Sequence, residues 1–289
     1  NIKRAINFWS KETCIDFFLR TNETVYLAFE GQNNGCYASV GRDTWVNKND
    51  VNIGAGCYGF GRTSHELAHN LGMYHHQQRY DRNDYITYND NNVDEKFRSN
   101  FDTIDEKLLS TYELPYDVGS VMHYGPFVYA VNTSIPVLMA KDRRLQSSMG
   151  NLLGPTFVDV AIINSLYKCI DQCNDRLNCT NGGYVDPRNC SICKCPSGFG
   201  GRLCNLREPS TLSGCGGILT ASTLLRRMVV DLDPSNGTFR ETCTYSIKVA
   251  KELGVRINSE NVSSTCVQGC HNGGIEMKPT KDVRPVGYR

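Results

Sequence analysis

The most constraining feature of the chain is a histidine-rich stretch, residues 65–79, which reads HELAHNLGMYHHQQR. His65 and His69 are four positions apart, so on a helix they share one face and can bind the same zinc ion. Glu66 lies beside the first of these histidines and can act as a general base toward a water on that metal. The stretch therefore predicts a helix that carries a zinc site.

The residues that follow complete a three-histidine pattern. Gly72 accepts the left-handed backbone that ends a helix, so the chain can turn back and bring His75 to the same ion. Three imidazoles leave one coordination position open, which is typical of catalytic rather than structural zinc. A bare HExxH also occurs on ordinary solvated helices, but the extended pattern disfavours that interpretation. The adjacent His76 leaves open a second binding register.

A second motif occurs further along the chain, where Ser120–Gly125 reads SVMHYG. The extended histidine pattern followed by a Met-turn defines the metzincins, and Met122 fits the methionine of that turn. Taken alone, Met122 would be interpreted as an ordinary core methionine. The two motifs together favour a metzincin-type metal centre.

These segments resemble the astacin family of zinc endopeptidases. Further matching segments are Tyr80–Ile86, Thr13–Phe17, Cys36–Arg42 and Asn164–Cys169. The resemblance covers about residues 1–170 and implies an α+β, two-subdomain zincin-like protease with a central active-site helix and a Met-turn. It places the active site in a cleft between the part carrying residues 1–72 and the part carrying residues 76–168.

The resemblance also implies a role for each residue of the centre. One zinc ion per chain is expected, and its implied ligands are His65, His69, His75 and Tyr124, the last as a fifth, displaceable ligand. Glu66 and Tyr124 are the expected catalytic residues, while Met122 and Gly72 are structural support. The family spacing favours His75 over His76 as the third imidazole.

Two features differ from the family pattern. The family usually has a further segment before the first helix, and the chain begins at that helix with Asn1. The family's third histidine is followed by a Glu that meets the mature N-terminus in a buried pair, and here that position is His76. Losing both partners is milder than burying one charge alone. We therefore do not carry the family's maturation mechanism over to this chain. Because the sequence begins with Asn1 and no signal-peptide pattern follows, we expect a processed product or a fragment.

The 14 cysteines among 289 residues favour an oxidising, extracellular setting. The family pairings imply the bridges Cys14–Cys169 and Cys36–Cys57. Six N-glycosylation sequons support secretion; their asparagines are Asn22, Asn132, Asn178, Asn189, Asn236 and Asn261. The net charge of +1 predicts no nucleic-acid partner, and no apolar run is long enough to predict a membrane span.

Residues 171–206 contain six cysteines between Cys173 and Cys204, too many for a conventional hydrophobic core. The segment resembles an EGF-like module, and that resemblance implies the bridges Cys173–Cys190, Cys179–Cys193 and Cys195–Cys204. The spacing Cys190-x-x-Cys193-x-Cys195 leaves a zinc knuckle as the rival interpretation. Sequence alone would allow fifteen connectivities.

Residues 207–289 resemble a divergent or truncated CUB domain, a β-sandwich. The resemblance rests on the segments that begin at Cys215 and Cys243 and implies a bridge between them. Cys266 and Cys270 are too close together to match the usual second pair. Protein partners that bind through the EGF-like and CUB-like segments are possible.

Residue patterns predict the main elements of the protease part. Apolar residues at roughly helical spacing predict a helix from Ile2 into Cys14. Strand-forming residues predict strands at Val25–Phe29, Tyr37–Val46 and Val51–Ile53. The metal helix is expected at Arg62–Leu71, and a further helix is expected at Val158–Leu166. Residues 93–110 are expected to form a loop and a short helix.

The sequence thus predicts a secreted endopeptidase in which zinc and Glu66 activate a water and Tyr124 stabilises the oxyanion. Its expected substrates are proteins or peptides. One alternative is a catalytically weak or inactive protease-like protein that binds extracellular partners. Another is a matrix component in which zinc only stabilises the fold.

Overall fold

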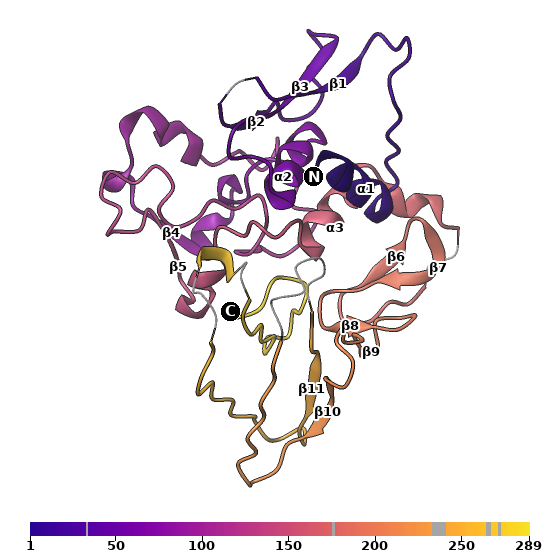
Figure 1. Cartoon of the computed structure of the whole chain (residues 1–289), viewed down its shortest axis with the longest axis vertical. Helices are drawn as coiled ribbons and strands as arrows, with labels where there is room; N and C mark the ends of the chain where they lie inside the picture. Colours follow the sequence, from indigo (N-terminus) through magenta and orange to yellow (C-terminus); the bar gives the residue numbers. More distant parts are fainter. Residues whose placement is uncertain (33, 175–176, 233–240, 264–266, 271–272) are drawn as a thin grey trace.

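The computed structural model describes all residues except 33, 175–176, 233–240, 264–266 and 271–272. Residues 1–170, the expected protease part, place three α-helices at the centre of the molecule, with a small sheet above them (Figure 1). The helices are α1 (Ile2–Glu12), α2 (Phe60–Asn70) and α3 (Phe157–Leu166). Among the described residues, none of the helices is both long and apolar enough to cross a bilayer.

The small sheet has the strand order β1-β3-β2, with β1 parallel and β2 antiparallel to β3. Its strands are β1 (Tyr26–Glu30), β2 (Cys36–Ala38) and β3 (Lys48–Ile53). The expectation of one strand over Tyr37–Val46 is wrong, because only its first two residues pair with β3. Gly41 has a φ of 71°, and the Asp43 carboxylate accepts the Trp45 N–H at 2.9 Å. A local turn therefore replaces the rest of that strand.

Helix α1 packs its buried face, Ala5 and Trp9, against α2. The Trp9 indole donates a hydrogen bond to the Ser64 carbonyl oxygen at 3.2 Å, which fixes the two helices to each other. At the start of α2, a Cβ on Gly61 would lie 2.0 Å from the Leu152 carbonyl oxygen. Only glycine fits at this helix start, because the loop before α3 passes directly against the backbone.

Three hydrophobic clusters form the core of the protease part, and the smallest, Val51, Ile53 and Cys57, lies at the small sheet. The first joins α1, α2 and α3 to the Met-turn, and it includes Leu67, Met122 and Ile163. The second lies within residues 86–149, around Phe101 and Leu138. The second cluster surrounds the antiparallel pair β4 (Ile86–Tyr88) and β5 (Leu138–Ala140), with short 3-10 turns at Glu95–Phe101 and Arg143–Ser148. Helix α2 therefore belongs to the first cluster.

Six disulfides cross-link the described residues, and they are the pairings that the resemblances imply. They are Cys14–Cys169, Cys36–Cys57, Cys173–Cys190, Cys179–Cys193, Cys195–Cys204 and Cys215–Cys243. The rival zinc knuckle is excluded, because its three cysteines are all in disulfides. Cys270 forms no disulfide with any described residue, and Cys266 lies outside them, as does the Asn236 sequon.

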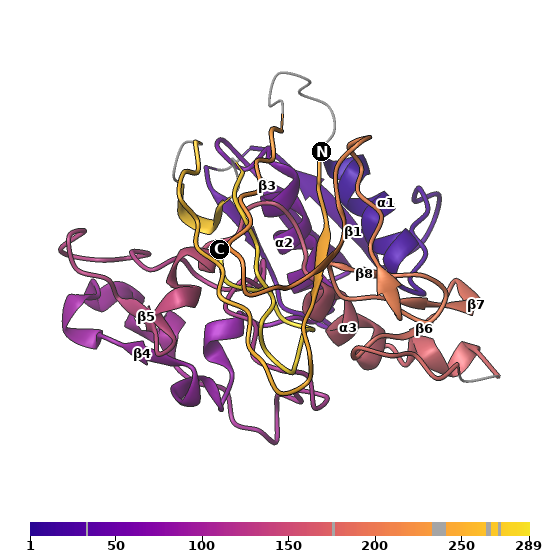
Figure 2. The ribbon, with the colours of Figure 1, turned by 90° about the horizontal axis from the view of Figure 1, so that it is seen from below.

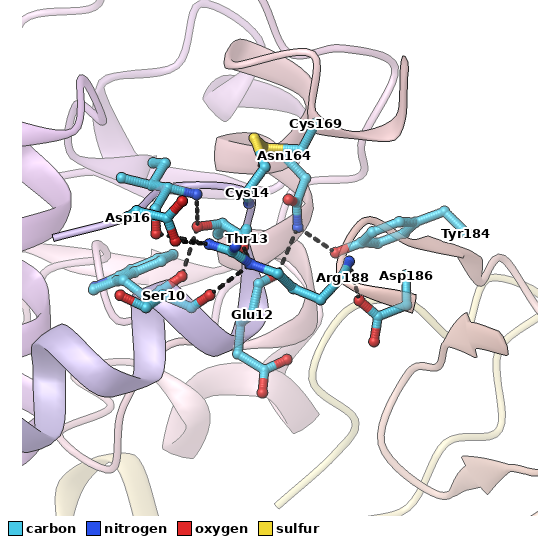
Figure 3. The surroundings of a disulfide bond; sticks show 12 residues. Ser10, Glu12, Thr13, Cys14, Asp16, Asn164, Cys169, Tyr184, Asp186 and Arg188 are labelled. Atoms are coloured by element: carbon cyan, nitrogen blue, oxygen red, sulfur yellow. Dashed lines mark hydrogen bonds and ion pairs between the residues drawn. A yellow bond between two sulfur atoms is a disulfide. The ribbon is translucent and has the colours of Figure 1, made fainter. Parts of the chain in front are cut away.

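Residues 171–206 form two short antiparallel pairs. They are β6 (Tyr184–Asp186) with β7 (Asn189–Lys194), and β8 (Phe199–Gly200) with β9 (Leu206–Arg207). This module rests against the end of α1 and the Cys14–Cys169 bridge (Figure 3). The Lys194 ammonium lies 2.7 Å from the Glu12 carboxylate, and the Asn164 amide of α3 donates to the Tyr184 hydroxyl at 3.0 Å. The module is thus fixed to the protease part.

In the described part of residues 207–289, the strands form one parallel pair, β10 (Gly217–Thr220) with β11 (Tyr245–Lys248). The expected β-sandwich does not form among these described residues. The final stretch returns to the protease part, and the C-terminus lies beside that part in both views (Figures 1 and 2). Met277 and Tyr288 form an isolated antiparallel bridge there.

Candidate metal centre

Helix α2 presents His65 and His69 toward His75, which follows the helix after a tight turn. The turn closes with two hydrogen bonds, from Gly72 N–H to the His69 carbonyl at 2.8 Å and from Met73 N–H to the Ala68 carbonyl at 3.0 Å. This pattern is the Schellman motif, which needs a left-handed residue after the helix. Gly72 provides it with a φ of 103°. The predicted role of Gly72 follows from this geometry.

The three histidines bring one ring nitrogen each to within 4.8 Å of one another. The Nε2 atoms of His69 and His75 are 3.2 Å apart. Two nitrogens bound to one tetrahedral zinc at ordinary bond lengths lie about 3.4 Å apart. The spacing of the imidazoles therefore matches a shared zinc ion.

Backbone carbonyls orient two of the three imidazoles. The Nδ1 atom of His65 lies 2.7 Å from the Val121 carbonyl oxygen, and Nδ1 of His69 lies 2.7 Å from that of Met73. Since a carbonyl can only accept, each Nδ1 carries the proton, and the lone pair of the neutral ring is on Nε2. The Nε2 atoms of His65 and His69 are therefore unprotonated, as a metal ligand must be.

Burial keeps these imidazoles neutral. It lowers the pKa of His65 to about 3, with His69 adding to the shift. Burial also lowers the pKa of His69, and it lowers that of His75 well below its ordinary value, with further effects from the other two histidines. Metal binding needs neutral imidazoles. Because these three are already neutral, a metal ion can bind without displacing a proton from them.

His76 is not part of this cluster. Its ring is buried, and its Nε2 accepts the backbone N–H of Asp117 at 3.0 Å. Its own backbone N–H donates to the Met122 carbonyl oxygen at 2.8 Å. The alternative register, in which His76 would be the third zinc ligand, is therefore excluded. His76 instead connects the segment that carries His75 to the Met-turn and to Asp117, which precedes that turn.

Glu66 is 6% exposed, and burial raises the pKa of its carboxyl to about 7. A bound divalent cation would favour the carboxylate instead. The ring centre of Tyr124 lies 4.5 Å from that of His75. Burial raises the Tyr124 pKa, with smaller contributions from Tyr129 and from the Glu66 charge. The pKa values of the Glu66 carboxyl and the Tyr124 hydroxyl are thus both raised above their ordinary values.

Met122 is fully buried in the cluster that contains Leu67 of α2, so it supports the helix and provides no ligand. The Met-turn is held by Asp159 of α3, whose carboxylate accepts the Ser120 hydroxyl at 2.5 Å and the Val121 N–H at 3.0 Å. Asp159 thereby fixes the carbonyl that orients His65. The sequence reasoning missed this residue, although a charge within the apolar run 157–163 was a visible signal.

Gln77 is a second supporting residue that the sequence reasoning missed. It is fully buried, and its side-chain oxygen accepts the Tyr124 N–H at 3.0 Å.

A hollow of about 560 Å³ opens beside Tyr80 and Ser165, and none of the predicted site residues lines it. The expected substrate cleft between the two parts of the protease therefore stays a prediction.

Three neutral imidazoles around one point, with a buried carboxylate on the same helix, define a mononuclear metal centre of hydrolytic type. Residues 1–168 match the model of the astacin peptidase family. The chain belongs to this family of zinc metalloproteinases.

Two relatives from Caenorhabditis elegans match nearly the whole chain. The zinc metalloproteinase nas-29 is 46% identical over 288 residues, which cover 100% of the chain and 54% of that relative. The zinc metalloproteinase nas-23 is 40% identical over 286 residues, covering 99% of the chain and 53% of that relative. The chain thus spans about half the length of these relatives.

A solved structure shares the fold of the protease part. It is high choriolytic enzyme 1, a hatching enzyme zinc-protease from the medaka fish Oryzias latipes, with a TM-score of 0.54 and 30% identity. The match covers 58% of the chain and 80% of that structure. The mixed α/β zincin-like fold is therefore common to both.

Proposed function

We propose that the chain is a zinc-dependent endopeptidase that hydrolyses internal peptide bonds of proteins. The observation that carries this proposal is the convergence of three neutral imidazoles beside a buried Glu66. When bound, zinc supplies Lewis-acid activation of water and of the substrate carbonyl. A closed structural site would use four protein ligands, and the cluster among the described residues offers three.

The residues of the chain have separate tasks in this reaction. His65, His69 and His75 hold the ion. Glu66 accepts the proton of the attacking water and donates it to the leaving amine. The Tyr124 hydroxyl, a fifth and displaceable ligand in our proposal, donates a hydrogen bond to the oxyanion that develops in the transition state.

We also propose an extracellular location and an EGF-like identity for residues 171–206, followed by a CUB-like segment over residues 207–289. The dense disulfides support both the location and the module. The Cys215–Cys243 bridge supports the CUB-like assignment. Extracellular protein partners and glycosylation of the sequons belong to the same proposal.

The decisive experiment measures cleavage of a quenched peptide with an acidic residue after the scissile bond. The zinc-loaded chain is compared with its Glu66→Ala variant, and Glu252→Ala, an exposed glutamate, is the matched control. We expect turnover that a chelator abolishes, that Glu66→Ala lacks and that the control retains. Folded chain with bound zinc and no turnover, on this peptide or on denatured protein, would favour the inactive binding protein.

A further inference from the structure

The stretch 276–289 docks on the protease part next to the Met-turn. The Val286 N–H donates to the Asp117 carboxylate at 3.1 Å, although the two residues are 169 positions apart. The Ser148 hydroxyl donates to the Gly287 carbonyl at 3.3 Å, and the Tyr288 hydroxyl donates to Asp142 at 3.0 Å. Val286 is 9% exposed, so this residue of the stretch is buried against the protease part.

The residue of the protease part that lies against Val286 is a glycine, Gly119. A Cβ on Gly119 would lie 2.6 Å from the Cβ of Val286. The φ of Gly119 is not in the left-handed region, so its backbone would accept any residue. Space for Val286 is therefore the physical reason for glycine at this position.

Gly119 directly precedes the Met-turn, and Asp117 connects it to the docked stretch. One Asp117 carboxylate oxygen accepts both the Gly119 N–H at 3.0 Å and the Val286 N–H. Two residues beyond Gly119, the Val121 carbonyl accepts the His65 imidazole N–H at 2.7 Å. A short run of hydrogen bonds and backbone thus leads from Val286 to a metal ligand.

We propose that residues 276–289 are a positioning element of the metal centre. By seating Val286 on Gly119 and Asp117, this stretch fixes the turn that aims the Val121 carbonyl, and through it the imidazole of His65. Partners that orient a metal-bound histidine affect both metal affinity and activity. The activity readout rests on the proposed peptidase function, whereas the zinc-affinity readout does not.

The test is a compensating pair of substitutions. Gly119→Ala places a methyl group against Val286, and we expect zinc affinity, measured by chelator competition, to fall about 10–100-fold. The value of kcat/KM should fall by a similar factor, mainly through kcat. Adding Val286→Gly to Gly119→Ala removes the clash and should restore most of both quantities. Lys281→Ala, an exposed change in the same stretch, should leave both unchanged.

A second variant covers the case in which Gly119→Ala does not fold. Val286→Pro removes the N–H that Asp117 accepts and leaves the protease sequence intact. It should lower zinc affinity in the same direction. Unchanged zinc affinity in both variants would overturn the proposal, and so would a loss in Gly119→Ala that the double variant does not restore. If the wild-type chain binds zinc without turnover, the proposed function fails, but the zinc-affinity comparison still decides this inference.

Discussion

The Arg188 guanidinium donates a hydrogen bond to the Thr13 carbonyl oxygen at 2.6 Å, which joins the disulfide-rich module to the end of α1 (Figure 3). The same guanidinium reaches the Asp16 carboxylate at 2.7 Å and the Ile15 carbonyl at 3.0 Å. These partners lie on both sides of Cys14. One side chain of the module therefore binds the segment that the Cys14–Cys169 bridge fixes to the 3-10 turn Cys169–Gln172, which follows α3.

Replacing Arg188 with alanine should destabilise the chain. Hydrogen bonds to a charged group contribute about 1.5–3 kcal/mol, and several are lost together, so we expect the free energy of unfolding to fall by roughly 2–3 kcal/mol. Chemical denaturation measures this change. Arg202→Ala is the matched control, because that side chain bonds to Ser191 within the module. Equal losses in the two variants would contradict the docking role of Arg188.

The two disulfides of the protease part should differ in their contribution to stability. Cys14–Cys169 spans 155 positions, and Cys36–Cys57 spans 21. Loop-closure entropy predicts about 5 kcal/mol for the first bridge and about 3 kcal/mol for the second. Paired Cys→Ala variants, compared by denaturant unfolding under oxidising conditions, should therefore lose more stability without the long-range bridge. Equal losses would show that chain entropy does not dominate.

Asp159 should give the chain a specific dependence of stability on pH. Burial, with the nearby Asp117 charge adding to it, raises the Asp159 pKa from 3.8 to about 6. Between these values the folded state binds a proton that the unfolded state has released, so stability falls as pH rises from 4 to 6. The loss amounts to roughly 3 kcal/mol and stays constant at higher pH.

The Asp159→Asn variant isolates this effect. Asparagine has one acceptor oxygen, whereas Asp159 accepts from Ser120, Val121 and Thr156, so the variant should be less stable at every pH. The difference between wild type and variant should be largest near pH 4 and should shrink toward pH 7. Denaturant unfolding at equal free zinc measures it. Parallel stability curves would show that Asp159 does not titrate in this range.

Tyr124→Phe should separate catalysis from metal binding. The Tyr124 ring lies beside that of His75. The substitution removes the Tyr124 hydroxyl, which is one donor to the developing oxyanion. Removing one such donor typically costs about 100–1,000-fold in kcat. We expect kcat to fall in this range, while zinc affinity and KM change little. Tyr58→Phe, at an exposed tyrosine, serves as the control.

The sequence alone predicted that His65, His69 and His75 converge, because histidine spacing on a helix and a glycine after its end are local patterns. The role of Tyr124 as a further ligand stays a prediction. The spacing could not show the carbonyls of Val121 and Met73 that orient the imidazoles, since every residue has a carbonyl group. The strand over Tyr37–Val46 was wrong because alternation ignores side-chain capping, and Asp43 caps a turn there.

Contacts between distant segments were the least predictable. Gly119 could have been interpreted as a turn glycine, and only the position of Val286 shows why a side chain does not fit. The docking of Arg188 depends on bonds to carbonyls about 175 positions away, which no local pattern encodes. The expected β-sandwich rested on two short segments, and among the described residues these form a parallel pair.

The bridge between Cys14 and Cys169 also constrains how the chain is made. Its two cysteines are 155 positions apart, so at ordinary synthesis rates the first waits roughly 10–30 s for the second to emerge. During that delay Cys36 and Cys57 become available, and Cys14 can pair with either of them. The helix that carries the metal ligands is thus complete long before the protease part can be locked. Correct pairing therefore depends on early closure of Cys36–Cys57, or on a thiol-exchange catalyst that reverses wrong bridges.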